Sequence, residues 1–376
     1  MNIRKILFWT HLILGCSAAL FIFLMSVTGV ALTYERQMIK AAQRADYPSP
    51  PINNSQSHAQ VLSTTELINI AKGYPTKKAV KIVLINEENA PIVVKDGRKT
   101  LAYLNPYTGE EMATPGEGTK IFLGKLRAFH RWLTLDGKFS ETGRWVNGTA
   151  NVFFVILVLS GLYLWLPKLF KSRAFKQKLT LGGNYPTKQA RNYQWHNVFG
   201  FYVAPILFVI TCTATFFSFK WPAEILKQVT STPAVSIKAT ALPTPVVTTR
   251  QTLTVEKQLI QIKNQFPQWQ SINFTLSADP TDIQIFAIDK GNGGEPQKRL
   301  TVVVDAVTGQ VIQQQHFEQL STYRKARSYI RFLHTGEVFG LVGQTIAGLA
   351  SLFACLLVYT GVMLSWRRWK NSRRKT

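Results

Sequence analysis

The chain has 376 residues, of which 46% are hydrophobic, and a formal net charge of +24. That length allows one large or two modest domains. The charge could indicate a nucleic-acid-binding protein, but the basic residues gather beside long apolar runs, which favours a membrane protein instead. All three cysteines, Cys16, Cys212 and Cys355, lie inside apolar runs, which excludes an external disulfide framework.

Four apolar runs are long enough to cross a bilayer, which takes about 20 helical residues. They cover residues 6–33, 146–166, 198–219 and 346–366. The first run resembles a signal peptide, but its length and the absence of a clear cleavage site predict that it stays as a membrane helix. Segments rich in Lys and Arg precede the first run, follow the second and form the C-terminal tail. Such segments face the cytoplasm, so both termini are predicted inside and the two long connections outside.

Each long connection has the pattern of a small α+β domain. In residues 34–120, a linker rich in Pro, Ser and Asn precedes a helix at 64–71, which has a Thr cap and an acid in its first turn. Strand-like pieces follow at 79–85, 91–95 and 100–104. In residues 221–329, a linker rich in Pro and Thr precedes a helix at 253–265 and strands at 271–276, 283–288 and 300–304. The last strands end in turns that align as Asn-Pro-Tyr-Thr-Gly and Asp-Ala-Val-Thr-Gly.

The chain contains an internal repeat. His11 with Gly15 matches His196 with Gly200, and Ser160-Gly161 matches Thr360-Gly361. Gly143 and Gly148 match Gly343 and Gly348, although His130 precedes Gly143 by 13 residues and His334 precedes Gly343 by 9. The prediction is an α-helical membrane protein with four transmembrane helices in two internal repeats and two small external α+β domains. Its segments are 1–33, 34–120, 121–167, 168–194, 195–220, 221–329, 330–366 and 367–376, of which 168–194 is a basic cytoplasmic loop and 367–376 a basic cytoplasmic tail.

Four of the six histidines flank the apolar runs in matched pairs. His11 and His196 lie five or six residues after the last cytoplasmic basic residue, and His130 and His334 lie on the external side. We therefore expect an inner pair, His11 with His196, and an outer pair, His130 with His334. Gly15 and Gly200 follow the inner histidines on the same helical face and are expected beside the imidazoles, where they leave room for a flat ligand. His58 and His316 are expected to be solvated surface residues.

Two imidazoles are too few for a structural zinc site, but they complete the coordination of a haem iron. The sequence has no Cys-x-x-Cys-His, so covalent c-type attachment is excluded. The expected cofactors are therefore two haem b groups, with the four histidines as axial ligands of the iron. Plain packing roles and a proton relay are the alternatives for these residues. Near the outer pair, Arg127, Arg131, Arg327 and Arg331 could neutralise haem propionates, attract an anionic substrate or anchor the helices at the membrane surface.

Other catalytic motifs are lacking: the sequence holds no Walker loop, no Ser-His-Asp order, no His-Glu-x-x-His and no flavin or nicotinamide motif. Electrons must therefore come from another molecule, either a quinol or a cytosolic flavoprotein. The catalytic residues are unknown from the sequence, and the four histidines are expected only to bind the cofactor.

The chain resembles the PepSY-associated transmembrane helix family over nearly its whole length. The motifs are His11 with Gly15, Phe129-His130-Arg131 before Gly143-Arg144, Ser160-Gly161-Leu162-Tyr163, Trp195-His196 with Gly200, Leu333-His334-Thr335-Gly336 before Phe339-Gly340, and the Thr-Gly turns of both external segments. The two copies are imperfect, since Arg144 has Gln344 and Gly29 has Ala214 as counterparts. The family includes iron-regulated inner-membrane proteins that look like ferric-siderophore reductases, which implies a bacterial inner-membrane protein with PepSY-like external domains in the periplasm.

The expected function is a di-haem oxidoreductase that passes electrons to a periplasmic acceptor, with a ferric siderophore as substrate. A non-enzymatic PepSY module that binds or regulates a periplasmic partner is the alternative, and a transporter subunit is a third. No nucleic acid is expected as a partner.

Overall fold

The computed structural model describes residues 2–51, 60–76, 79–167, 172–230, 243–277 and 279–373. The chain forms two compact units, each assembled from separate stretches of sequence. The helical unit comprises Met1–Glu35, Ile121–Val229 and Tyr329–Thr376, and the sheet unit comprises Arg36–Lys120 and Thr230–Ser328. Each unit has a hydrophobic core of its own.

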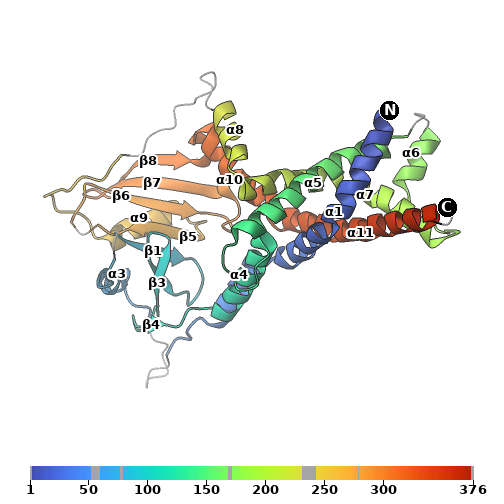
Figure 1. The fold of residues 1–376 in the computed structure, drawn as a ribbon. Coiled ribbons are helices and arrows are strands. Elements are labelled where there is room, and N and C mark those ends of the chain that lie inside the picture. The colour runs from blue at the N-terminus through green and yellow to red at the C-terminus, as the bar shows by residue number, and fades with distance from the viewer. Residues whose placement is uncertain are drawn as a thin grey trace. The chain divides into compact units, whose positions relative to one another are not determined.

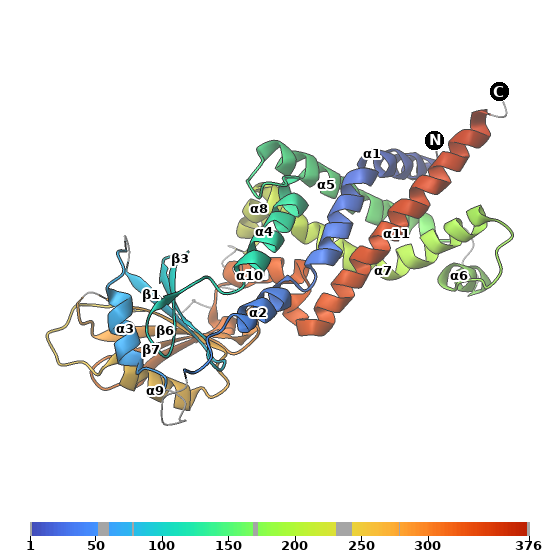
Figure 2. The same ribbon diagram turned by 90° about the horizontal axis from the view of Figure 1, so that it is seen from below.

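Four long helices build the helical unit, and each is long and apolar enough to cross a membrane. Within it α1 and α7 each pack against both α5 and α11 (Figures 1 and 2). Small side chains such as Ala18, Ala150 and Ala350 lie buried where these helices meet, as is usual between membrane helices. Large apolar side chains such as Leu159 and Leu352 stay exposed, which suits a lipid-facing surface. The bounds are α1 Ile3–Leu32, α5 Glu141–Trp165, α7 Lys188–Ser218 and α11 Gly340–Arg373.

Two shorter helices end directly before α5 and α11. They are α4 (Glu117–Trp132), which carries His130, and α10 (Thr322–His334), which ends on its histidine. A Cβ on Gly143 would overlap the carbonyl oxygen of Trp132, and one on Gly343 would overlap that of Gly336. Each of these carbonyls lies two residues after the histidine. The glycines therefore let the chain turn back closely onto the following helix in both places. The loops between the helices differ in length, which accounts for the spacings of 13 residues from His130 to Gly143 and 9 residues from His334 to Gly343.

The two chain termini lie at the same end of the bundle (Figures 1 and 2), and basic residues are common in the segments there. Arg4 donates hydrogen bonds to the carbonyls of Leu164 and Leu166 at 2.8 and 2.9 Å, and Lys178 of α6 (Ser172–Leu179) donates to that of Trp165. These contacts satisfy carbonyls that the C-terminal end of α5 leaves without helical partners. Arg368 lies over the ring of Phe8 at 4.9 Å. This end of the bundle is therefore strongly positive.

An eight-stranded antiparallel sheet forms the other unit, in the order β4-β3-β2-β1-β5-β6-β7-β8. The central neighbours β1 and β5 pair with Ile82 opposite Phe274. The segments 34–120 and 221–329, expected as two separate domains, thus share one sheet, which corrects that prediction. Either half alone would expose a long strand edge and bury only a small core. The strands are β1 Val80–Ile85, β2 Ile92–Asp96, β3 Lys99–Leu104, β4 Glu111–Met112, β5 Ser271–Thr275, β6 Ile283–Asp289, β7 Arg299–Asp305 and β8 Val311–His316.

Helices α3 (Thr64–Lys72) and α9 (Val255–Gln265) cover one face of the sheet (Figure 2). The cap of α3 is Ser63, which forms a capping box with Glu66, so the expected threonine cap is wrong by one residue. The two Thr-Gly turns have the same geometry, with Gly109 and Gly309 at φ +74° and +76°. Strands β4 and β8 were not predicted. The remaining elements are α2 Glu35–Ala45, α8 Trp221–Thr230 and the short 3-10 helices η2 Pro296–Lys298, η3 Phe317–Gln319 and η4 Glu337–Phe339.

Candidate functional site

The helical unit brings four histidines together as two pairs. His11 of α1 and His196 of α7 have ring centroids 6.4 Å apart, with ring planes at 87°. His130 of α4 and His334 of α10 also have centroids 6.4 Å apart, with planes at 59°. His316 is exposed at the end of β8, and His58 lies outside the described residues. The two predicted pairs are therefore two compact clusters, each with two imidazoles.

Hydrogen bonds fix the orientation of the inner imidazoles. The Nδ1 atoms of His11 and His196 lie 2.9 Å from Ser160 Oγ and Thr360 Oγ1, respectively. These two hydroxyls donate their own protons to the carbonyls of Ile156 and Leu356, at 2.7 and 2.8 Å. Each hydroxyl oxygen must therefore accept from an Nδ1–H, since its single proton is already used. The lone pair of each imidazole is then on Nε2, the form in which histidine binds a metal ion.

The outer imidazoles have the same tautomer through different acceptors. His130 Nδ1 lies 2.8 Å from Thr28 Oγ1, which donates to the carbonyl of Leu24 at 2.6 Å. His334 Nδ1 lies 3.0 Å from the carbonyl oxygen of Ile210 and 3.3 Å from Thr213 Oγ1. A carbonyl oxygen can only accept, so His334 also donates from Nδ1. All four histidines therefore keep Nε2 as an unprotonated nitrogen.

Glycines border three of the rings, but they come from neighbouring helices. A Cβ on Gly161 would lie 3.2 Å from Cε1 of His11, and one on Gly361 would lie 3.4 Å from that of His196. Gly29 stands in the same relation to His130 at 3.7 Å. Gly15 and Gly200, which were expected beside the inner imidazoles, face the side chains of Leu157 and Leu357 instead, at 3.6 Å. That expectation is wrong, because a glycine on the histidine's own helix faces the adjacent helix here.

The partner residues share a short sequence pattern that was not linked to the histidines. Ser160-Gly161, Thr360-Gly361 and Thr28-Gly29 each place a hydroxyl and then a glycine against one imidazole. Thr213 places a hydroxyl near the fourth imidazole, but Ala214 follows it instead of a glycine. Thr28 lies 17 positions after His11, and Thr213 lies 17 positions after His196. This equal spacing is the signal in the sequence that could have identified them.

One guanidinium, that of Arg131, lies near the outer pair. The guanidinium of Arg131 lies 4.9 Å from the ring of Trp132 and 5.7 Å from that of Phe217, which in turn contacts the His334 ring edge-on at 5.3 Å. Burial and the nearby guanidiniums of Arg127 and Arg331 lower the pKa of Arg131.

A carboxylate pairs with Arg127 but not with Arg131. Arg127 pairs with Glu35 at 2.6 Å, whereas Arg131 pairs with no carboxylate among the described residues. Arg327, also predicted near the outer pair, belongs to the sheet unit. The outer pair therefore lies beside a guanidinium with no counter-charge in this part of the chain.

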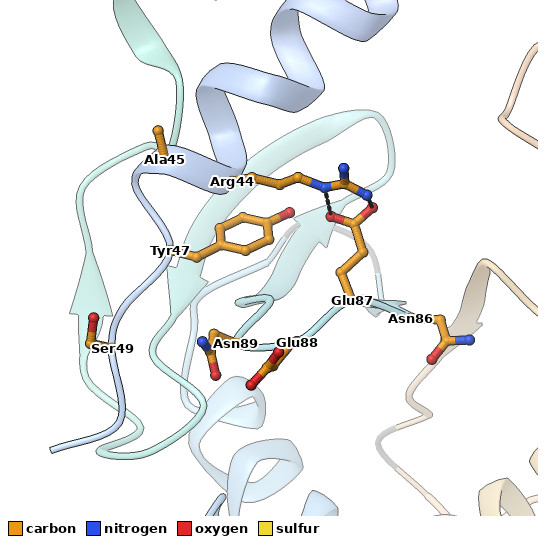
Figure 3. Close-up of a pocket in the computed structure, with 8 residues that line it drawn as sticks. All are labelled: Arg44, Ala45, Tyr47, Ser49, Asn86, Glu87, Glu88 and Asn89. Atoms are coloured by element: carbon orange, nitrogen blue, oxygen red, sulfur yellow. Dashed lines mark hydrogen bonds and ion pairs between the residues drawn. The ribbon is translucent and has the colours of Figure 1, made fainter. Parts of the chain in front are cut away.

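The sheet unit holds a pocket of about 640 Å³ that the sequence did not indicate (Figure 3). Arg44 binds Glu87 through two hydrogen bonds of 2.8 and 3.0 Å, and Lys40 pairs with the same carboxylate. Burial raises the pKa of Glu87, but the hydrogen bonds from Arg44 and Lys40 outweigh it and the pKa lies below its usual value. Burial and the nearby Glu87 charge raise the pKa of Tyr47 to about 12. The charges of this pocket therefore compensate one another.

Each histidine pair can supply two neutral nitrogen ligands to one metal ion. In the described ranges, no cluster of three or more His, Cys, Asp and Glu side chains is present.

Residues 8–368 match the family model described as the PepSY-associated TM region, a range that includes all four histidines. No curated protein matches the chain. Four apolar helices packed as a bundle, and a family match over nearly the whole sequence, identify this chain as a multi-pass membrane protein of the PepSY-associated TM region family.

Proposed function

We propose that the protein carries electrons across a membrane through two haem b groups, one held by His11 and His196 and the other by His130 and His334. The observation that carries this proposal is the 6.4 Å separation of the ring centroids in both pairs. Two imidazoles that held one metal ion between them at about 2 Å each would have centroids about 6 Å apart once the size of the rings is added. The spacing in both pairs therefore fits two imidazoles that would hold one metal ion.

The donor chemistry supports haem over other metal groups. Each pair offers two neutral imidazoles, whereas a structural zinc ion takes four protein ligands. A haem held by one such pair would bring its own remaining iron ligands and would supply one-electron redox chemistry. The lack of Cys-x-x-Cys-His leaves non-covalent, b-type binding. The chain's own part would be to leave each Nε2 free to bind the iron, through the hydrogen bonds made by Nδ1, and to hold the imidazoles in the apolar bundle.

The spacing along the helices supports a path across the membrane. The 17 positions between His11 and Thr28, which contacts His130, correspond to about 26 Å along α1. The same interval separates His196 from Thr213 on α7, as expected if the chain consists of two internal repeats. Because basic segments face the cytoplasm, the proposal assigns His11 and His196 to the cytoplasmic side of a bacterial inner membrane. The sheet unit, which contains the PepSY-like segments, would then lie in the periplasm.

The proposed acceptor is Fe(III) bound to a siderophore. One electron delivered at the side of His130 and His334 would reduce Fe(III) to Fe(II), which hard oxygen donors bind less tightly, so the iron would be released. The electrons come from a quinol or a reduced cytosolic flavoprotein, since the chain has no flavin or nicotinamide motif. A non-enzymatic module that binds a periplasmic partner is the competing function, in which the histidines are structural.

Two measurements on the purified protein test this function. With full haem supply during expression, the reduced-minus-oxidised spectrum should contain a b-type signal, at about two haems per chain by pigment assay. Dithionite-reduced protein should then be reoxidised by ferric siderophores, with release of Fe(II) that a ferrous chelator traps, and ferricyanide serves as a control oxidant. A colourless protein would reject the haem proposal and favour the binding module. Two haems that react with ferricyanide but with no ferric siderophore would reject the acceptor.

A further inference from the structure

We propose that Ser160, Thr360 and Thr28 are positioning residues that fix the tautomer of His11, His196 and His130 and thereby set how strongly these ligands donate to the iron. This inference rests on the proposed binding of haem by the same histidines. It assigns a role to three hydroxyl groups on the helices that face the ligands.

The three hydroxyls are committed as acceptors by the helices that carry them. Each donates its proton to the carbonyl four residues earlier, at 2.6 to 2.8 Å, and so presents only lone pairs to the imidazole. Their residues are almost completely buried, with 4%, 0% and 5% of the surface exposed for Ser160, Thr360 and Thr28. Buried groups of this kind cannot exchange their partner for water. The acceptor is therefore permanent.

The fourth histidine shows what differs when the hydroxyl is not the nearest acceptor. His334 lies closer to the Ile210 carbonyl than to Thr213 Oγ1, at 3.0 against 3.3 Å. The residue after Thr213 is Ala214, whereas the other three hydroxyl residues are followed by glycine. His334 thus retains an acceptor without Thr213, so this threonine serves as a natural control for the other three.

The hydrogen bond on Nδ1 affects the opposite nitrogen. A ligand histidine that donates from its other ring nitrogen is held in one orientation and is more basic toward the metal ion. A more basic ligand favours Fe(III) over Fe(II) and lowers the reduction potential. Removing the acceptor should therefore raise the potential of that site and leave the other site unchanged.

The test compares Thr360→Val with Thr213→Val, because both replace a hydroxyl by a methyl group of similar size. In the full-length, haem-loaded protein, Thr360→Val should change the reduction equilibrium of one haem roughly tenfold, which is about 59 mV for a one-electron couple. Thr213→Val should change it less than twofold, and Thr360→Ser should restore the wild-type potential. Equal potentials in wild type and Thr360→Val would overturn the inference.

A second readout does not need haem. In full-length protein purified without haem and labelled with 15N-histidine, the His196 signal should report a proton on Nδ1 in the wild type. In Thr360→Val it should report a mixture of both tautomers, and in Thr213→Val no signal should change. If the protein binds no haem but the tautomers shift in this way, the positioning role stands and the proposed function fails. If two haems bind while potential and tautomer stay unchanged in Thr360→Val, the proposed function stands and the positioning role fails.

Discussion

The two histidine pairs have the same centroid spacing but are built from different kinds of element. His11 and His196 lie on long apolar helices, and their acceptors Ser160 and Thr360 lie on the two others. His130 and His334 lie on the shorter helices α4 and α10, and their acceptors come from α1 and α7. The first pair therefore follows from the packing of the bundle alone. The second also depends on how α4 and α10 turn back onto α5 and α11.

The connection of α4 to α5 illustrates this dependence. Asn147 Nδ2 of α5 donates to the carbonyl of His130 at 2.7 Å, one turn from Gly143, which abuts the carbonyl of Trp132. In the second half, Gly343 abuts Gly336, and the position equivalent to Asn147 is Ala347. The comparison teaches that a site on membrane helices needs only their packing, whereas a site on connecting helices needs extra close contacts.

Removal of single ligands should separate the pairs most clearly. His196→Ala should lower the haem content from about two to about one per chain, because a single axial histidine remains at that site. His130→Ala should remove the other haem instead, so the two difference spectra should add up to that of the wild type. The control is His316→Ala, an exposed histidine of the sheet unit. Loss of both haems in well-folded His196→Ala, judged by size-exclusion chromatography, would contradict independent sites.

Gly143→Ala should damage only the pair that depends on α4. The added Cβ would overlap the Trp132 carbonyl, and such overpacking costs about 1–3 kcal/mol. We expect loss of the haem bound by His130 and His334 with the other one retained, measured by pigment content and redox titration. The matched control is Gly118→Ala, in the first turn of α4, where a Cβ meets nothing within 4 Å. An equal loss at both sites would show that the bundle, and not the connection, had been disturbed.

Gly161→Ala should perturb the other pair to a smaller extent. Its Cβ would lie 3.2 Å from Cε1 of His11, so the ring must shift by a few tenths of an ångström, at a cost of about 1 kcal/mol. The expected readout is a shifted potential and absorption band of that haem alone. Gly15→Ala is the comparison, since its Cβ meets only Leu157 at 3.6 Å. A larger shift of the potential and absorption band in Gly15→Ala than in Gly161→Ala would favour the original prediction that Gly15 lies beside the His11 imidazole.

Arg131→Gln should affect the electron acceptor according to its charge. The guanidinium of Arg131, which pairs with no carboxylate in the described part of the chain, lies near His334 and attracts anions, and such steering contributes roughly tenfold to association rates at low ionic strength. Reoxidation of reduced protein by an anionic ferric complex should slow by about this factor, while a neutral ferric trihydroxamate should react at the wild-type rate. Stopped-flow traces at low and high salt measure both, and the difference should vanish at high salt. A slower reaction with the neutral complex would point to damage at the haem instead.

Glu87→Gln should leave both pairs intact and change only the sheet unit. The pKa of Glu87 lies below its ordinary value of 4.5, so its contribution to stability is present above about pH 4.5 and disappears as the pH falls below its folded pKa. Because Arg44 and Lys40 are half exposed, the loss at pH 7 should be about 0.5–1 kcal/mol. Thermal unfolding at pH 7 and pH 3 measures the loss of stability caused by Glu87→Gln, with Asp136→Asn as a control at an exposed carboxylate. Equal destabilisation at both pH values would contradict the sign of the shift.

Much of the arrangement could be predicted because the relevant signals are local. Apolar length identified the four long helices, and short stretches rich in β-forming residues identified six of the eight strands within one or two residues. The family was recognised from motifs at matched spacings and is confirmed. The assignment of His11 to His196 and of His130 to His334 came from their equivalent depth in the sequence pattern, and these are the rings that lie together.

The rest depends on contacts between distant segments. Gly15 is four residues from His11 on the same helix, which the sequence shows directly, whereas Gly161 reaches that ring only through helix packing. The pairing of β1 with β5 joins strands almost 200 residues apart, and no turn motif announces it. Ser160 and Thr360 were recognised as equivalent positions of the internal repeat, but not as residues that contact the histidines. A repeat alone already explains why the two positions match, so the match did not indicate a contact with the imidazoles.

The distribution of each pair over the two halves of the chain has a consequence for biosynthesis. His11 and His130 are made in the first half, but His196 and His334 follow much later, and Thr360 comes last of the acceptors. Strand β1 likewise cannot pair with β5 until β5 has been made, and β5 follows α7 in the chain. Neither imidazole pair can close around a cofactor while the ribosome is still translating the first 195 residues. If the pairs hold haem as proposed, the cofactor could be bound by both histidines of a pair only after the third long helix has been made, and a product that stopped before residue 196 would hold one histidine of each pair.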